Sequence, residues 1–288
     1  METIKLGKTG VDVSAIGMGG MPMSLRDRPK ESQSISVIHR ALELGITFID
    51  TADSYCKDES DKHHNEQLIH KAISTYNGDV NHVVVATKGG LMRFGGNWTR
   101  NGNPDHLRET IRTSFETLGG NKPIDLWQYH APDPNYQIEA SLAAAKEAVD
   151  AGMIRFVGVS NFSVEQIQRA RDVVDIVSVQ NQYSPWVRSP ETDGVLKYCE
   201  QEKLTFLPWS PFGGGSRHQK LTEIKAIAEL AKEKGVSVYC IVLEWLRAKS
   251  PCILPIPGAS KVSSIEDSVK AVEVKLTDEE VQKIDQQK

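Results

Sequence analysis

The strongest constraint on the fold is a regular alternation along the chain between short apolar runs and helical patterns. The apolar runs lie at 14–18, 46–49, 83–87, 124–129, 154–159, 176–180, 204–208 and 252–256. Helical patterns separate most of them, at 32–44, 65–76, 105–118, 136–150, 163–173, 191–203, 219–234 and 237–249, and the last two share one connection. Alternating strands and helices predict an α/β fold with a parallel sheet and helical crossovers. Eight such strands in 288 residues predict a closed (β/α)8 TIM barrel.

Both ends of the chain carry additions to this repeat. Residues 3–13 alternate apolar and polar side chains around Gly7 and Gly10, which predicts an N-terminal β-hairpin cap. Thr277 precedes Glu280 by three residues, the spacing of a capping box, which predicts an extra C-terminal helix. The glycines of 94–102 indicate a mobile lid that carries Trp98. We see no linker or low-complexity tract, so residues 1–288 are predicted to form a single domain.

Composition narrows the classes of function. Apolar residues make up 39% of the chain and charged residues 25%, with a net charge of −4. No long basic block favours nucleic acid or an anionic membrane. The first ten residues lack the apolar segment of a signal peptide, and no apolar run approaches the length needed to span a membrane. The four cysteines are scattered without a CxxC pair. We expect a cytoplasmic protein with reduced thiols.

Three of the predicted strands end on side chains that can transfer or orient a proton. Asp50 ends the second strand, Lys88 the third and His130 the fourth, and Tyr55 follows Asp50 closely. The carboxyl ends of barrel strands form one rim, where barrel enzymes carry their chemistry. A lysine held by an aspartate would lower the pKa of a neighbouring tyrosine from about 10 and make it a general acid. A charged strand end is often only solvated and a single histidine is often structural, but the set together favours protonation of a carbonyl oxygen.

The motifs that carry these residues also resemble a known family. DTADSY at 50–55, ATKGG at 86–90 and DLWQYH at 125–130 look like the aldo-keto reductases, (β/α)8 NADP-dependent carbonyl reductases. The resemblance continues in order through GMIRFVGVSNF (152–162), VQNQYS (179–184), LPWSPFGGG (207–215) and ILPIPGAS (253–260). It implies NADPH-dependent reduction of an aldehyde or ketone to the alcohol. Tyr55 would be the general acid, Asp50 and Lys88 would tune it, and His130 would orient the carbonyl.

The same resemblance implies where a cofactor would bind. Family residues that match Ser160, Asn161 and Gln180 hold the nicotinamide carboxamide, and Trp209 falls where a ring stacks on the nicotinamide. Gly20 and Met21 match the family residues that approach the nicotinamide ribose, and Asp50 lies next to them in the same cofactor-binding set. The pyrophosphate would lie against the glycine-rich segment, whose backbone amides can approach an anion: Ser210, Pro211, Phe212, Gly213 and Gly214.

The adenosine end departs from the family pattern. Many members carry Lys or Arg at positions that match Gly258 and Ser264, where the cation holds the ribose 2′-phosphate. In this sequence a phosphate would instead be bound at the start of a helix by Lys261, Ser260 and Ser264. The positions that contact the adenine amino group match Glu266 and Asp267. NADP is the favoured cofactor, and NAD is the alternative.

The substrate would be a small carbonyl compound. An apolar pocket for aromatic or mid-sized aldehydes is predicted from Met23, Trp98, Trp186 and Phe212. No metal site is expected, because the histidines at 63, 64 and 70 lack a ligand motif. Two other functions stay open: a slow, cofactor-sensing regulatory subunit of the same fold, and a lyase in which Lys88 forms a Schiff base. The oligomeric state is not readable from the sequence.

Overall fold

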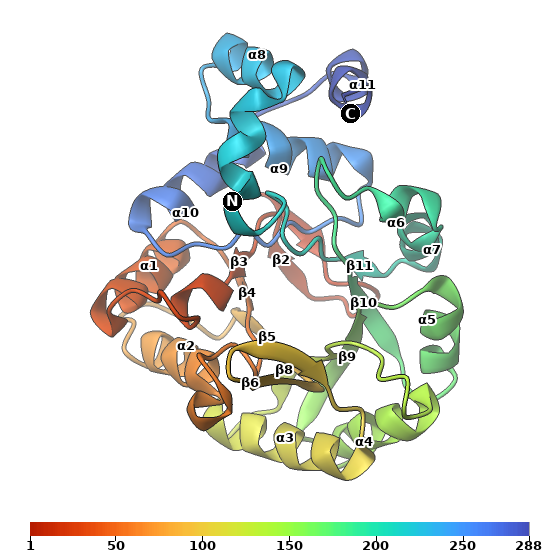
Figure 1. Ribbon diagram of the computed structural model, residues 1–288. Coiled ribbons are helices and arrows are strands. Elements are labelled where there is room, and N and C mark those ends of the chain that lie inside the picture. The colour runs from red at the N-terminus through yellow and green to blue at the C-terminus, as the bar shows by residue number, and fades with distance from the viewer. Residues whose placement is uncertain (288) are drawn as a thin grey trace.

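A curled parallel sheet forms the centre of the molecule (Figure 1). The computed structural model describes residues 1–287, so Lys288, the last residue of the predicted domain, lies outside the described residues. Seven strands pair in the order β11-β10-β9-β8-β5-β4-β3, and every pair is parallel. Their bounds are β3 Met18–Gly19, β4 Phe48–Asp50, β5 Val84–Gly89, β8 Ile124–Tyr129, β9 Ile154–Ser160, β10 Ile176–Gln180 and β11 Thr205–Phe206.

Residues 252–258 close the ring between β11 and β3. The Phe206 N–H donates to the Cys252 carbonyl at 2.8 Å, and the Leu254 N–H donates to Phe206 at 2.9 Å. On the other side, the N–H groups of Gly17 and Gly19 each donate at 2.9 Å, to the carbonyls of Pro255 and Pro257 respectively. Pro255 and Pro257 accept these hydrogen bonds but have no N–H to donate in return. The segment therefore pairs with the chain around β3 without forming a continuous ladder. The predicted (β/α)8 barrel is confirmed, with its eighth strand present as isolated bridges.

Helices surround the strands (Figure 1). In chain order they are α1 Glu31–Glu43, α2 His64–Ser74, α3 Pro104–Thr117, α4 Ile138–Asp150, α5 Val164–Arg171, α6 Ser189–Thr192, α7 Val195–Glu202, α8 Lys225–Lys234, α9 Val238–Lys249, α10 Val262–Val269 and α11 Asp278–Asp285. The predicted C-terminal helix is confirmed as α11, with the Thr277–Glu280 capping box present. It packs outside the barrel against α8 and α9.

The predicted N-terminal hairpin is also confirmed. Strands β1 Thr3–Lys5 and β2 Asp12–Ser14 pair antiparallel. The Gly7 N–H donates to the Thr205 hydroxyl at 2.7 Å, and Leu6 is fully buried in a cluster that includes Phe48 and Leu126. Since Thr205 begins β11, the hairpin closes the amino-terminal end of the barrel. The opposite rim is left for the functional side chains.

Three predicted segments differ from the structure. The helix expected at 191–203 is divided into α6 and α7 by Gly194, whose φ of 85° favours glycine. The helix expected at 219–234 begins instead as the 3-10 segment η3, Gly215–Glu223, ahead of α8. The segment expected as a lid folds as a hairpin, β6 Leu91–Phe94 and β7 Asn97–Arg100, with Gly95 and Gly96 both at positive φ as a two-residue turn requires, and its mobility stays a prediction.

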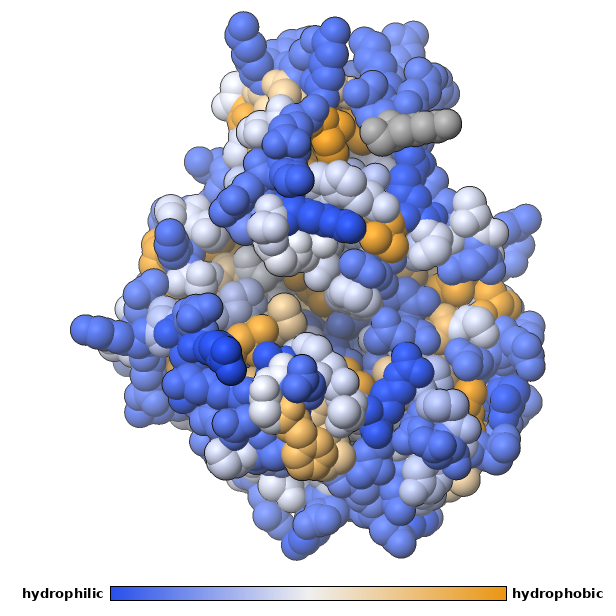
Figure 2. Space-filling view, viewed as in Figure 1, coloured by the Kyte–Doolittle hydropathy of each residue, from blue (hydrophilic) through white to orange (hydrophobic). Residues whose placement is uncertain are grey.

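The described helices include none that combines the length and apolar character needed to cross a membrane. Figure 2 shows the face seen in Figure 1 as largely hydrophilic, with a hollow near its centre.

Candidate active site

The predicted proton-transfer side chains meet at the carboxyl-terminal rim of the barrel. Asp50 is the last residue of β4, Lys88 lies near the end of β5, and His130 follows β8. All three are less than a tenth exposed, as is Tyr55 on the loop after β4. The loop is fixed by backbone bonds, because the Asp53 N–H donates to the Lys88 carbonyl at 3.1 Å. Parallel strands therefore bring together groups that are far apart in the sequence.

Lys88 is the centre of this group. Its ammonium donates to the Asp50 carboxylate at 2.7 Å, to the Thr51 carbonyl at 2.7 Å and to the Tyr55 hydroxyl oxygen at 3.0 Å. An ammonium has three donors and no acceptor, so the Tyr55 oxygen accepts from Lys88 and keeps its own proton for another acceptor. Gln180 donates to the second Asp50 oxygen at 2.8 Å and fixes that carboxylate. The arrangement orients a phenolic proton toward the cavity that Tyr55 lines.

One expectation about these groups is wrong. Burial raises the pKa of Tyr55, and the nearby Lys88 ammonium only opposes that effect in part. Burial by itself would lower the pKa of Lys88, but attraction to Asp50 and Tyr55 outweighs it and raises that pKa. The pair is therefore a charged lysine beside a protonated phenol, rather than a phenol with a lowered pKa. A protonated phenol is still the form that a general acid requires.

His130 faces the same space with a neutral ring. Burial, and next the Lys88 charge, lower its pKa well below the usual value for histidine. Its ring stands edge-on to that of Tyr55, with centroids 5.8 Å apart, and its Nδ1 is buried without a hydrogen-bond partner. Trp98, from the β6–β7 hairpin, approaches the rings of both Tyr55 and His130. A neutral imidazole that has one donor and one acceptor can hydrogen-bond an uncharged carbonyl oxygen.

The next section of the rim carries the side chains expected near a nicotinamide. The Ser160 hydroxyl donates to the Gln180 carbonyl at 2.8 Å, and the Asn161 side-chain amide donates to the His130 carbonyl at 2.9 Å. The Trp209 indole donates to the Asn161 side-chain oxygen at 3.1 Å. Asn161 and Ser210 have positive φ values of 64° and 49°, unusual for non-glycine residues and common where a binding site holds the backbone. These bonds fix the amides and the indole ring relative to Tyr55.

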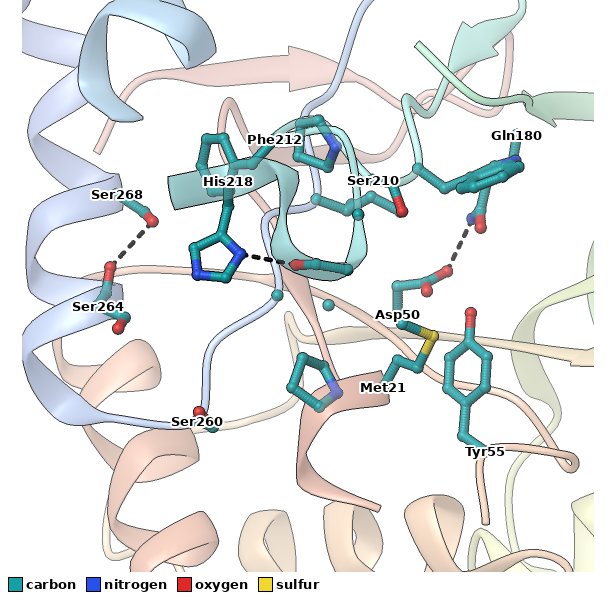
Figure 3. Close-up of a pocket in the computed structure, with 18 of the residues that line it drawn as sticks. Met21, Asp50, Tyr55, Gln180, Ser210, Phe212, His218, Ser260, Ser264 and Ser268 are labelled. Atoms are coloured by element: carbon teal, nitrogen blue, oxygen red, sulfur yellow. Dashed lines mark hydrogen bonds between the residues drawn. The ribbon is translucent and has the colours of Figure 1, made fainter. Parts of the chain in front are cut away.

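A single cavity of about 970 Å³ joins this rim to the start of α10. Figure 3 shows Asp50, Tyr55 and Gln180 on one side of it and Ser260, Ser264 and Ser268 on the other. The residues fit an extended dinucleotide. Trp209 offers an aromatic face, and a Cβ on the lining residue Gly258 would come within 2.8 Å of Pro22. The first turn of α10, with Lys261 as its N-cap, presents backbone N–H groups to an anion.

Some predicted binding residues lie away from the cavity. Met23 is fully buried among apolar residues between the strands, α1 and α2, because the 3-10 turn Met21–Met23 directs it away from the rim. Trp186 lies behind the cavity wall, where a Cβ on Gly213 would meet its ring at 2.5 Å. Glu266 pairs with Arg40 at 2.8 Å. Gly20 and Gly213 adjoin lining residues and are not themselves part of the lining.

The other predicted residues line the cavity: Met21, Asp50, Tyr55, Trp98, His130, Ser160, Asn161, Gln180, Trp209, Ser210, Pro211, Phe212, Gly214, Ser260, Lys261, Ser264 and Asp267. Lys88 lies just beneath, in contact with Tyr55. Within the described residues, no group of three or more His, Cys, Asp or Glu side chains is arranged to hold a metal. His63 bonds Glu66 and His64 bonds Ser24, so these histidines have separate partners.

Sequence reasoning missed several lining residues, among them Leu91, His218, Tyr239, Ser263 and Ser268. Ser263 directly precedes the predicted Ser264 on α10. Ser268 follows Ser264 by four residues and so lies on the same face of the helix, which a complete helical wheel of that segment would have shown. His218 and Tyr239 carry no motif. They reach the cavity only because η3 and α9 fold over it.

Comparisons with known proteins agree with this geometry. The Aldo/keto reductase family model matches residues 15–288. An uncharacterized oxidoreductase of Schizosaccharomyces pombe is 37% identical over 290 residues, which cover 99% of this chain and 89% of the relative. A thermostable aldo-keto reductase, solved in complex with the inhibitor epalrestat, has a TM-score of 0.83 at 30% identity over 99% of both chains. The glycerol dehydrogenase of Gluconobacter oxydans has a TM-score of 0.82 at 26% identity, over 98% of this chain and 94% of its own. The chain is thus an oxidoreductase enzyme that belongs to the aldo/keto reductase family.

Proposed function

We propose that the enzyme reduces an aldehyde or ketone to the alcohol with NADPH, and that Tyr55 donates the proton. The observation that carries this proposal is the Tyr55 hydroxyl, whose oxygen accepts from Lys88 at 3.0 Å while its proton stays available to the cavity. As negative charge develops on a carbonyl oxygen, the phenol transfers that proton. The charged Lys88 stabilises the phenolate left behind, and Asp50 keeps Lys88 charged.

His130 holds the carbonyl oxygen in this scheme. Its neutral ring donates one hydrogen bond to the oxygen and adds no net charge that would compete with Lys88. The apolar faces of Trp98 and Leu91 enclose the rest of the substrate, which favours aromatic or mid-sized carbonyl compounds. Exclusion of water by these side chains strengthens the hydrogen bonds at the oxygen.

The remaining lining residues would hold the cofactor, which supplies the hydride when it is bound. Ser160, Asn161 and Gln180 would bind the carboxamide, and the Trp209 ring would stack on the nicotinamide. Ser210 to Gly214 would lie along the pyrophosphate, and Lys261 with the first turn of α10 would receive the adenosine phosphates. We favour NADP over NAD because Lys261 and the α10 N-terminus both attract an additional phosphate.

Lys88 is poorly placed for the Schiff-base alternative. All three of its donors are used and attraction to Asp50 raises its pKa, so it lacks the free electron pair that attack on a carbonyl needs.

The test is a titration of the purified enzyme with NADPH and with NADH, followed by a panel of aldehydes with the nucleotide that binds more tightly. We expect aldehyde-dependent oxidation of NADPH, fastest with aromatic aldehydes. Tight NADPH binding without turnover on any aldehyde or ketone would contradict the proposal and favour a cofactor-sensing role.

A further inference from the structure

We propose that His218 recognises the 2′ position of the cofactor's adenosine ribose, binding a 2′-phosphate with a charged ring and a 2′-hydroxyl with a neutral ring. The inference rests on the proposed function in that a nicotinamide nucleotide must occupy the cavity. It goes further by assigning a role to a residue outside the predicted cofactor contacts and by linking cofactor choice to uptake of one proton.

The position of His218 supports this role. It lies on η3 and lines the same cavity as Ser260, Lys261 and Ser264. Figure 3 shows its ring on the side of Ser264 and Ser268, with Asp50 and Tyr55 across the view. A nucleotide with its nicotinamide at Trp209 would reach this end with its adenosine half.

This end of the cavity is short of positive charge. Lys261 is the only lysine or arginine among the described residues that line the cavity. Gly258 and Ser264, which also line it, carry no charge. A ribose 2′-phosphate has close to two negative charges near neutral pH, since the second pKa of a phosphate monoester is about 6. A second cation is therefore needed for full neutralisation, and His218 can supply one.

The hydrogen bond of the ring determines how it does so. Nδ1 of His218 lies 2.7 Å from the Gly215 carbonyl oxygen. Because a carbonyl only accepts, Nδ1 must carry a proton. Nε2 is then an acceptor when the ring is neutral and a donor when it is charged. The neutral ring can accept from a ribose hydroxyl, and only the charged ring can donate to a phosphate.

Other charged and titratable groups belong to the same segment or line the same cavity. Arg217 and Lys220 lie on η3 with His218, and Lys261 at the N-cap of α10, Asp267 of α10 and Tyr239 of α9 line the cavity. Asp267 also accepts from the Ser237 hydroxyl at 2.5 Å. A bound dianion attracts a proton to the ring, so phosphate binding and proton uptake at His218 are coupled.

The test is isothermal titration calorimetry with 2′-phospho-ADP-ribose and with ADP-ribose, repeated in buffers of different ionisation enthalpy near neutral pH. These ligands lack the nicotinamide, so the measurement does not depend on turnover. We expect the wild-type enzyme to take up more protons with the phosphorylated ligand than His218→Gln does. Its preference for that ligand should fall as pH rises from about 6 to about 8, the range in which histidine titrates.

Two variants separate charge from structure. His218→Gln keeps a neutral hydrogen-bonding side chain and should lose about tenfold in affinity for the phosphorylated ligand, with little change for ADP-ribose. His218→Lys carries a permanent cation and should restore the affinity without the pH dependence. The control His82→Gln, which changes an exposed histidine, should behave as the wild type.

Equal proton uptake by the wild type and His218→Gln, with tight binding in both, would overturn the inference and leave the reductase proposal intact. If neither ADP-ribose ligand, NADPH nor NADH binds the wild type, both proposals fail together.

Discussion

The Lys88 ammonium lies 3.0 Å from the Tyr55 hydroxyl oxygen and donates its other two protons to Asp50 and Thr51. This contact makes Tyr55 an acceptor toward Lys88, so its own proton can be donated only elsewhere. It also places a fixed positive charge where a phenolate would form. Both consequences can be tested by changing one side chain at a time.

Replacing Lys88 with Met should disable proton donation. Burial already raises the pKa of Tyr55, and loss of the ammonium removes the main opposing effect, so that pKa should rise further. We expect kcat for carbonyl reduction to fall by about 100-fold or more. The pH–rate profile measures this change. Lys71→Met is the control, because Lys71 is an exposed residue of α2 that pairs with Glu31 and makes no hydrogen bond to Tyr55. A profile identical to that of the wild type would contradict the assigned role of Lys88.

His130 should stay neutral where most histidines become charged. Since burial and Lys88 lower its pKa well below the usual value, acidification from about pH 8 to about pH 6 should leave its ring resonances unchanged in an NMR titration. The exposed His82 serves as the comparison residue. Movement of the His130 resonances over this pH range would show that the ring is more solvated than the structure indicates.

Asp53 should destabilise the fold above about pH 6. It is fully buried, and burial raises its pKa to about 6 from a reference of 3.8, although Lys62 opposes the shift. Between these values the folded protein binds more protons than the unfolded chain, so this group lowers stability as pH rises. A shift of about two units corresponds to about 3 kcal/mol. Urea unfolding of Asp53→Asn should therefore show a gain in stability of up to about 3 kcal/mol near pH 7.5 that shrinks toward about pH 4. An equal effect at both pH values would mean that the carboxyl does not titrate in this way.

Trp98 should contribute to substrate binding and not to cofactor binding. Its ring lies edge-on to Tyr55 at 6.3 Å between centroids, and 42% of the residue remains exposed at the mouth of the cavity. Trp98→Ala should raise KM for an aromatic aldehyde by about tenfold, the loss expected for one aromatic contact, and leave NADPH affinity unchanged. Phe94→Ala, on the same hairpin but outside the cavity lining, is the matched control. An equal effect of the two variants would indicate a change in the hairpin rather than a lost contact.

The sequence predicts the rim well because strand ends and their order can be read from it. Asp50, Lys88 and His130 each lie at or next to the end of a recognisable strand, and parallel pairing then brings them together. The direction of the Tyr55 pKa was not predictable, because it depends on how completely the ring is buried relative to a 3.0 Å contact. Met23 shows a different limit: a three-residue turn directs Met21 into the cavity and Met23 into the core, and no periodicity distinguishes the two.

Carbonyl reduction by Tyr55→Phe tests the central claim most directly, because the substitution removes only the hydroxyl that Lys88 contacts. NADPH oxidation with the best aldehyde measures turnover, and quenching of tryptophan fluorescence measures NADPH binding. We predict that turnover falls by about 100-fold to 10,000-fold while NADPH affinity stays close to that of the wild type. Turnover at the wild-type rate would show that the proton comes from another group and would contradict the mechanism.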